Sequence, residues 1–184
     1  MTLLSTPTIP TSSPEIRAQR LLDAGTAWGS RIAADNSSAQ LTYRVSGVGE
    51  GSVATRIRAG KHEFVVDEPA ALAGDDVAAS PVEYALGALV SCQVVVYRLY
   101  AQALGIAVDE ISIDATGELD ARTLFGIGGG PRAGFTSIAL AITITGPESE
   151  ERYNDLRAAV DAHCPVLDLF VNPTPVTSTV AKAG

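Results

Sequence analysis

The feature that most constrains this chain is a run without charge between Glu83 and Arg98. It lies inside a segment that carries helix signals at both ends. Ser80 can cap a helix, Pro81 suits the first helical position, and Glu83 completes a capping box with Ser80. Gly105 suits the left-handed position that ends a helix. The segment therefore predicts one long helix that is apolar on all sides.

A helix that is apolar on every side is normally buried on every side. Its length would also fit a membrane span, but Gln93, Arg98 and Gln102 lie in its second half, and the rest of the chain is strand-like. We therefore expect a long buried central helix in a soluble domain, with no membrane partner. One small sheet can hardly cover such a helix, so we also expect a homodimer.

Composition limits the possible partners and location. The chain has 184 residues, 46% of them hydrophobic and 18% charged, which is typical of one globular domain with a real core. A net charge of -8 without a basic patch argues against nucleic acid as a partner. Residues 1–14 lack the basic and apolar parts of a secretory signal, so we expect a cytoplasmic protein. Thiols stay reduced there, which favours a redox role for the two cysteines.

The pattern along the chain indicates an N-terminal arm with an accessory helix in residues 1–38 and the main domain in residues 39–184. Alternating apolar residues predict a three-stranded meander that starts at Leu41 and turns at Gly47–Gly51. Two more strands are expected after the central helix, around Ile111–Ala115 and Ile138–Ile144. Helices are then expected from Pro147 and from Pro165, and a last strand at Thr174–Val180. This order predicts an α+β fold with antiparallel sheets.

Cys92 and Cys164 are the two cysteines, 72 residues apart (164 − 92), and no Cys-x-x-Cys pair exists. They could be two small buried hydrophobic residues or a redox pair that the fold brings together. Cys164 precedes Pro165 at a helix start, where the helix field favours thiolate. Cys92 lies among apolar residues, which raise a thiol pKa. Taken alone, this makes Cys164 the better nucleophile unless a cation lies near Cys92.

Other ligand chemistries are poorly supported. His62 and His163 complete a set of two histidines and two cysteines, but the short spacings of zinc sites are missing, so we expect no metal. The glycines of Gly126–Gly130 are not followed by a Lys-Ser/Thr pair or by a helix. We interpret them as a flexible hairpin loop and expect no cofactor.

Several short motifs together resemble the OsmC/Ohr family over about residues 40–182. They are Val66–Pro69, Gly74–Asp76, Ser80–Tyr84, Ala88–Cys92, Cys164–Val166 and Asn172–Val176. The resemblance implies an OsmC-like α+β fold and an intertwined homodimer with its sites at the subunit interface. It also implies reduction of organic hydroperoxides by two cysteines, in defence against oxidative stress.

Matched residue by residue, Cys92 corresponds to the cysteine that attacks the peroxide and Cys164 to the one that resolves the sulfenic acid. An external dithiol would then reduce the disulfide. The peroxidase branches also use a glutamate and an activating arginine. We assign these roles to Glu83 and Arg58.

Two features depart from the peroxidase pattern. A glutamate directly follows the matching proline in those branches, whereas here Val82 follows Pro81 and Glu83 is one place later. The turn at Gly47–Gly51 has no arginine, which leaves those on the flanking strands, Arg44, Arg56 and Arg58. The alternative is therefore a non-enzymatic, redox-sensing or small-molecule-binding dimer, and a third possibility is a purely structural dimer module.

Overall fold

The computed structural model describes residues 8–184. Its helices are α1 (Pro14–Ala34), α2 (Pro81–Leu104), α3 (Glu150–His163) and α4 (Pro165–Val171), with short 3-10 turns η1 (Asn36–Ala39) and η2 (Ala70–Leu72). Its strands are β1 (Val45–Glu50), β2 (Ala54–Ala59), β3 (His62–Val66), β4 (Glu110–Glu118) and β5 (Ser137–Thr145). They form two antiparallel sheets, β1-β2-β3 and β4-β5. The predicted α+β class with small antiparallel sheets is confirmed.

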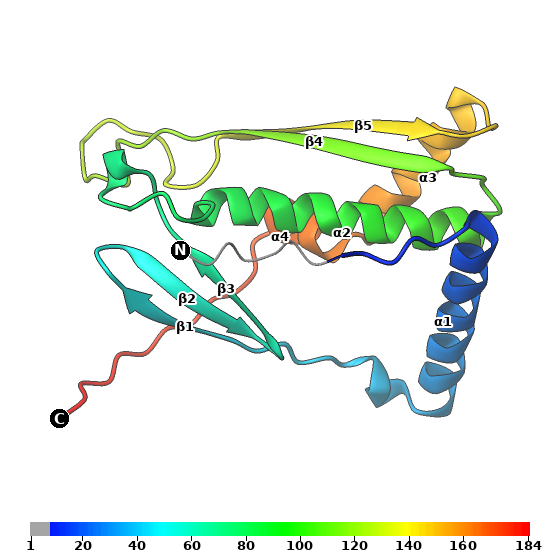
Figure 1. Cartoon of the computed structure of the whole chain (residues 1–184), viewed down its shortest axis with the longest axis horizontal. Coiled ribbons are helices and arrows are strands. Elements are labelled where there is room, and N and C mark those ends of the chain that lie inside the picture. The colour runs from blue at the N-terminus through cyan, green and yellow to red at the C-terminus, as the bar shows by residue number, and fades with distance from the viewer. Residues whose placement is uncertain (1–7) are drawn as a thin grey trace.

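Helix α2 is the element on which the others are arranged. The β4–β5 ribbon runs along one side of α2, α3 and α4 pack beside it, and α1 leaves from the region of its C-terminal end (Figure 1). The predicted helix ends are confirmed. The Glu83 carboxylate accepts from the Ser80 N–H at 2.7 Å, and Gly105 has a φ of 61°.

The main core lies between α2, α3 and the β4–β5 ribbon. Leu156 and Val160 of α3 are fully buried, and they pack with Val96, Tyr97, Ala101, Ile106 and Cys164. Strands β4 and β5 pair from Glu110 with Thr145 to Glu118 with Ser137, and burial alternates along both. The ribbon therefore turns its apolar face toward α2, as the period of two requires.

The expectation that α2 is buried on all sides does not hold for the single chain. Its buried residues are Leu89, Gln93, Val96, Tyr97 and Ala101. On the other side of the helix, Val95 is 56% exposed and Leu99 is 38% exposed. The β4–β5 sheet, α3 and α4 cover one face, and little of the described chain packs against the opposite face.

The first strand was misplaced by the sequence pattern. Strand β1 begins at Val45 rather than at Leu41, and it runs through most of the glycine-rich segment before turning at Gly51, which has a φ of 57°. A Cβ on Gly47 would lie 3.0 Å from Ile57 Cδ1, so glycine here lets β1 approach β2. Only the last of the three glycines makes the turn.

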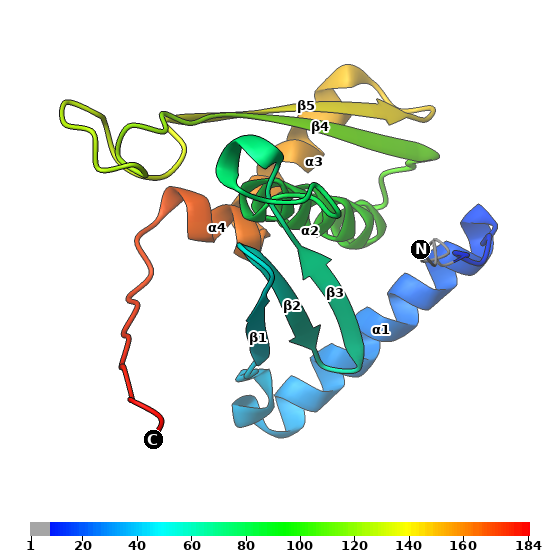
Figure 2. The ribbon, with the colours of Figure 1, turned by 60° about the vertical axis from the view of Figure 1, so that its left-hand side comes forward.

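The predicted strand at Thr174–Val180 is wrong. This segment extends away from α4 and pairs with no strand of residues 8–184 (Figure 2). Val176 is 87% exposed and Val180 is 99% exposed. An extended segment needs a neighbouring strand to accept its hydrogen bonds, and the periodicity of its apolar residues cannot show whether one is present.

Candidate functional site

The two cysteines come together where α2 passes the start of α4. Cys92 lies in the middle of α2 and is half-buried, whereas Cys164 is the N-cap residue of α4 and is 2% exposed. Cys164 belongs to the main core cluster, and Cys92 packs against that cluster. Both are free thiols. The fold therefore brings together two cysteines that no local sequence motif places side by side.

The pKa of Cys92 is raised above its ordinary value. Burial is the largest cause, a hydrogen bond from the Val166 backbone N–H works in the opposite direction, and the neighbouring Cys164 thiol raises the pKa further. No cationic side chain of residues 8–184 is among the groups that shift it. The apolar setting expected for Cys92 is present, and within residues 8–184 no cation contributes to the shift of its pKa.

Glu83 lies at the start of α2 and not beside Cys92. Its carboxylate accepts from the Ser80 hydroxyl at 2.6 Å as well as from the Ser80 N–H, and these contacts lower its pKa. Nine residues of helix separate it from Cys92, a rise of about 13.5 Å. Within one chain Glu83 acts as a helix cap, and its catalytic role stays a prediction.

Arg58 lies on β2 and forms an ion pair with Glu63, with 2.8 Å between Nη2 and Oε1. Its side chain is 68% exposed. The neighbouring candidate Arg56 makes a two-point contact with Glu50, at 2.7 and 2.9 Å. Within the chain both arginines pair with glutamates of their own sheet, so activation of Cys92 by either one stays a prediction.

An apolar cavity of about 550 Å³ lies one helical turn from each cysteine, although neither Cys92 nor Cys164 lines it. Leu89, one helical turn before Cys92, lines it from α2. Leu167, one turn after Cys164, lines it from α4 and also packs on the core cluster. The remaining lining comes mainly from the chain around the β4–β5 hairpin, including Phe135, Ile138 and Leu140. A cavity of this size and lining suits a small apolar molecule.

Among the described residues, Arg132 is the one charged residue in the lining of this cavity, and no sequence motif pointed to it. It follows the glycines of the loop between β4 and β5, which we interpreted only as a flexible hairpin loop. In the sequence, the nearness of the charged Arg132 to the apolar Phe135 is the signal that could have pointed to Arg132. Such a pair is typical of a pocket that holds an amphipathic molecule.

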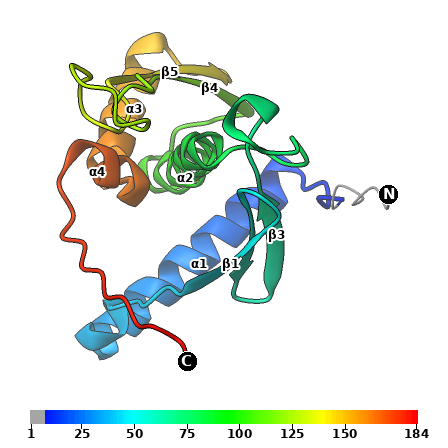
Figure 3. The same cartoon turned by 90° about the vertical axis from the view of Figure 1, so that its left-hand side faces the viewer.

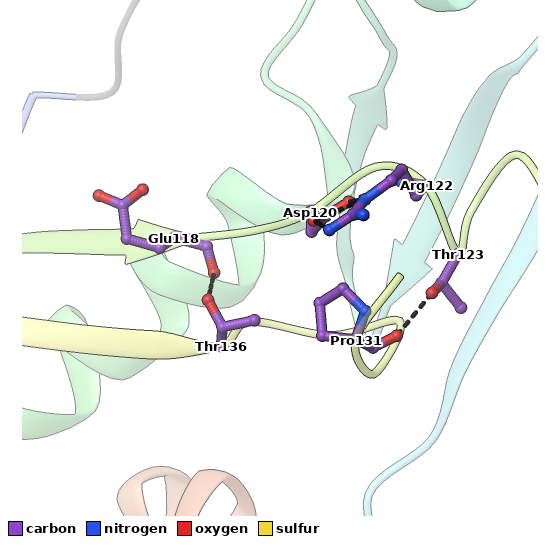
Figure 4. A network of polar contacts seen from close by, with 6 residues as sticks. All are labelled: Glu118, Asp120, Arg122, Thr123, Pro131 and Thr136. Carbon is purple, nitrogen blue, oxygen red and sulfur yellow. Dashed lines mark hydrogen bonds and ion pairs between the residues drawn. The ribbon is translucent and has the colours of Figure 1, made fainter. Parts of the chain in front are cut away.

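The hairpin loop is held by its own polar contacts (Figure 4). Thr123 donates to the Pro131 carbonyl at 2.6 Å, and Thr136 donates to the Glu118 carbonyl at 3.1 Å. Asp120 pairs with Arg122 near the start of the loop. These bonds fix the base of the loop beside the strands, which places Arg132 and Phe135 at the cavity.

The histidines do not form a metal site with the cysteines. The His163 ring stacks on Tyr100 with 4.4 Å between ring centroids, and its Nδ1 lies 2.7 Å from the Ala159 carbonyl oxygen. In the part of the chain that the structure describes, no three His, Cys, Asp or Glu side chains are placed to hold a metal ion. His62 lies at the start of β3, in the other sheet.

The fold and these motifs define a known class of protein. A family model described as OsmC-like protein matches residues 74–179, more than half of the chain. The chain therefore belongs to the OsmC-like protein family, and the resemblance seen in the sequence is confirmed. No curated protein matches it significantly.

Solved structures share this fold. An OsmC-like protein from Mycoplasma pneumoniae has a TM-score of 0.62 at 20% identity, over 71% of this chain and 88% of that one. A protein from Legionella pneumophila, described as an organic hydroperoxide resistance protein OsmC and predicted redox protein, has a TM-score of 0.57 at 20% identity, over 71% and 90%. At this identity the likeness concerns the fold alone.

Helix α2 is long and apolar enough to cross a membrane by length and composition, with 22% of its most apolar window buried. Within the chain, α2 packs against α3, α4 and β4 on one of its faces. Proteins of the OsmC/Ohr family are soluble, which agrees with that packing.

Proposed function

We propose that this protein is a thiol-dependent peroxidase that reduces organic hydroperoxides through Cys92 and Cys164. The observation that supports it most is the meeting of the two thiols, with an apolar cavity one helical turn away. The family motifs around both cysteines point the same way. Relatives described as organic hydroperoxide resistance proteins share the fold, which is consistent with the proposal.

The chemistry needs two steps. The Cys92 thiolate attacks the outer oxygen of the hydroperoxide, the O–O bond breaks, and the alkoxide leaves as an alcohol after taking a proton. The resulting sulfenic acid at Cys92 is attacked by the Cys164 sulfur, which forms a disulfide and releases water. An external dithiol then reduces the disulfide and is itself oxidised. A cytoplasmic location would provide such dithiols.

The proposal includes a homodimer, because one face of α2 has little packed against it. Ala88, Ser91, Val95 and Leu99 are exposed at helical spacing along this face, and none carries a charge. The small residues would let another helix approach closely. The β1–β3 sheet meets α2 at its first turn, where Phe64 packs on Tyr84, and otherwise stands apart (Figure 2). A second chain would cover the face and bring a cation to Cys92.

The second candidate is a non-enzymatic dimer that binds a small molecule or senses redox state. The raised pKa of Cys92 and the engagement of Glu83, Arg56 and Arg58 elsewhere in the chain favour it. The cavity with Arg132 would then be its binding site.

Steady-state consumption of an organic hydroperoxide with a dithiol reductant separates the two candidates. The peroxidase should turn over many equivalents, and both Cys92→Ser and Cys164→Ser should stop turnover with the dithiol. Consumption by the wild type at the rate of free cysteine would contradict the peroxidase and leave the binding protein.

A further inference from the structure

Helix α1 crosses beside α2 (Figure 3). One arginine from each of these helices reaches the segment after α2. Arg17 Nη2 donates to the carbonyl oxygens of Val108 and Asp109, at 3.2 and 3.3 Å. Arg98 donates to the same two oxygens, from Nη1 at 2.9 Å and from Nη2 at 3.3 Å. Two guanidinium groups therefore share one pair of acceptors.

Among the described residues, the Asp109 carboxylate attracts Arg98 but does not pair directly with either arginine. Neither Arg17 nor Arg98 forms an ion pair with a carboxylate there. Carbonyl oxygens offer only partial negative charge. Burial lowers the pKa of Arg98 and the charge of Arg17 lowers it further, although Asp109 acts in the opposite direction. Two like charges therefore share a partly buried site, where a bound anion would offset their mutual repulsion.

The two arginines line a small cavity of about 180 Å³. Pro14 and Leu21 of α1, Gln102 of α2 and Asp109 in the segment after α2 also line it, so one acidic residue shares the wall with the two arginines. The cavity is smaller than those that enclose drug-sized ligands, yet several times the roughly 30 Å³ share of one water. It has room for a compact ion.

We propose that this cavity binds a small oxyanion between Arg17 and Arg98. Guanidinium groups bind phosphate and carboxylate oxygens by paired hydrogen bonds, and each arginine has donors beyond those given to the carbonyls. The oxyanion joins α1 to α2, so its binding stabilises the docking of the N-terminal helix, which lies outside the residues matched by the family model. The site is separate from the cysteine pair and does not rest on the peroxidase proposal.

The test is calorimetric titration of the full chain with inorganic phosphate, and separately with acetate, at constant ionic strength. The wild type should bind phosphate, acetate or both saturably, with about one ion per chain. Arg17→Gln and Arg98→Gln should each weaken binding at least about tenfold, the effect of losing one paired charged contact. Arg20→Gln is the matched control, because Arg20 is exposed on the same helix, and it should bind like the wild type.

The phosphate and acetate titrations distinguish the chemical source of the oxyanion. Preference for phosphate identifies a phosphate or phosphate ester, and preference for acetate identifies a carboxylate, including one from another chain. If Arg98→Gln fails to fold, Arg17→Lys keeps the charge without the planar fork and should still weaken binding. Absence of saturable binding by the folded wild type, or an equal loss in Arg20→Gln, would overturn the proposal.

Discussion

Cys92 and Cys164 lie in different surroundings. The Cys92 thiol has a raised pKa because of burial, and a raised pKa lowers the fraction of reactive thiolate at neutral pH. Cys164 is more deeply buried than Cys92 and is part of the core. A peroxidase in which Cys92 attacks therefore needs a cation beyond those that the described residues bring to Cys92, and the proposed dimer would supply it.

Single-turnover oxidation will show which cysteine attacks. With one equivalent of an organic hydroperoxide, the wild type should lose two thiols to an intramolecular disulfide, because the two residues meet in the fold. Cys164→Ser should consume peroxide once and trap a sulfenic acid at Cys92, whereas Cys92→Ser should be inert. Thiol titration and intact mass measure both. A reactive Cys164 beside a silent Cys92 would reverse the assigned roles.

Asp67 should make stability depend on acid pH. Its side chain is buried, and Oδ2 accepts from the backbone N–H of Asp75 at 3.1 Å and of Val77 at 3.2 Å. Backbone N–H groups, those of Glu68 and Val77 foremost, lower its pKa. A lowered folded pKa gives stability that is present above the unfolded value of about 3.9 and is lost as pH falls through the folded value.

Chemical denaturation at several pH values checks this. The free energy of unfolding of the wild type should fall more steeply below about pH 5 than that of Asp67→Asn, which cannot ionise. Asp155→Asn, at an exposed position on α3, is the control and should keep the wild-type slope. Parallel curves for the wild type and Asp67→Asn would show that the loop carboxylate does not control acid stability.

At the scale of elements, α2 has one buried face and one exposed face. Leu89 is 1% exposed on the buried face and also lines the cavity one helical turn from the cysteines. Leu104, the last residue of the helix, is 47% exposed. The two leucines therefore test how much of the helix contributes to the core.

Leu89→Ala should lower the free energy of unfolding by about 2–5 kcal/mol, because it removes buried methyl groups and leaves a cavity. Leu104→Ala should cost much less, about 1 kcal/mol or below. Equilibrium denaturation measures both losses. A loss of under about 1 kcal/mol for Leu89→Ala would mean that α2 is not central to stability.

For the whole molecule, the exposed uncharged face of α2 predicts association. Sedimentation at micromolar concentration should give twice the mass of the chain. Val95→Glu should shift the population toward monomer, because it places a charge in the middle of an apolar interface. Ala158→Glu, on the exposed side of α3, should leave the dimer intact. A folded, stable wild-type monomer would remove both the dimer and the proposed interface site.

The sequence by itself determined α2, its cap and its end, since Ser80, Glu83 and Gly105 act through neighbours within one turn. Alternating apolar residues likewise predicted β2 to β5, and the start of α4 after Cys164 was predicted by its proline. These signals depend only on residues that are near in sequence, so they can be recognised without knowledge of the fold. The division at residue 38 stays a prediction.

Only the tertiary structure decided which of these parts meet. The packing of α3 and α4 on α2 brings Cys164 close to Cys92, which is 72 residues earlier in the sequence. The pairing of β2 with β3 places Arg58 opposite Glu63, where the two side chains form an ion pair. Pairing also decided that Gly47 lies inside β1 and that Thr174–Val180 has no neighbouring strand in the described chain. Contacts between distant segments depend on complementary surfaces and on which partners are present, and no periodicity within one segment records either.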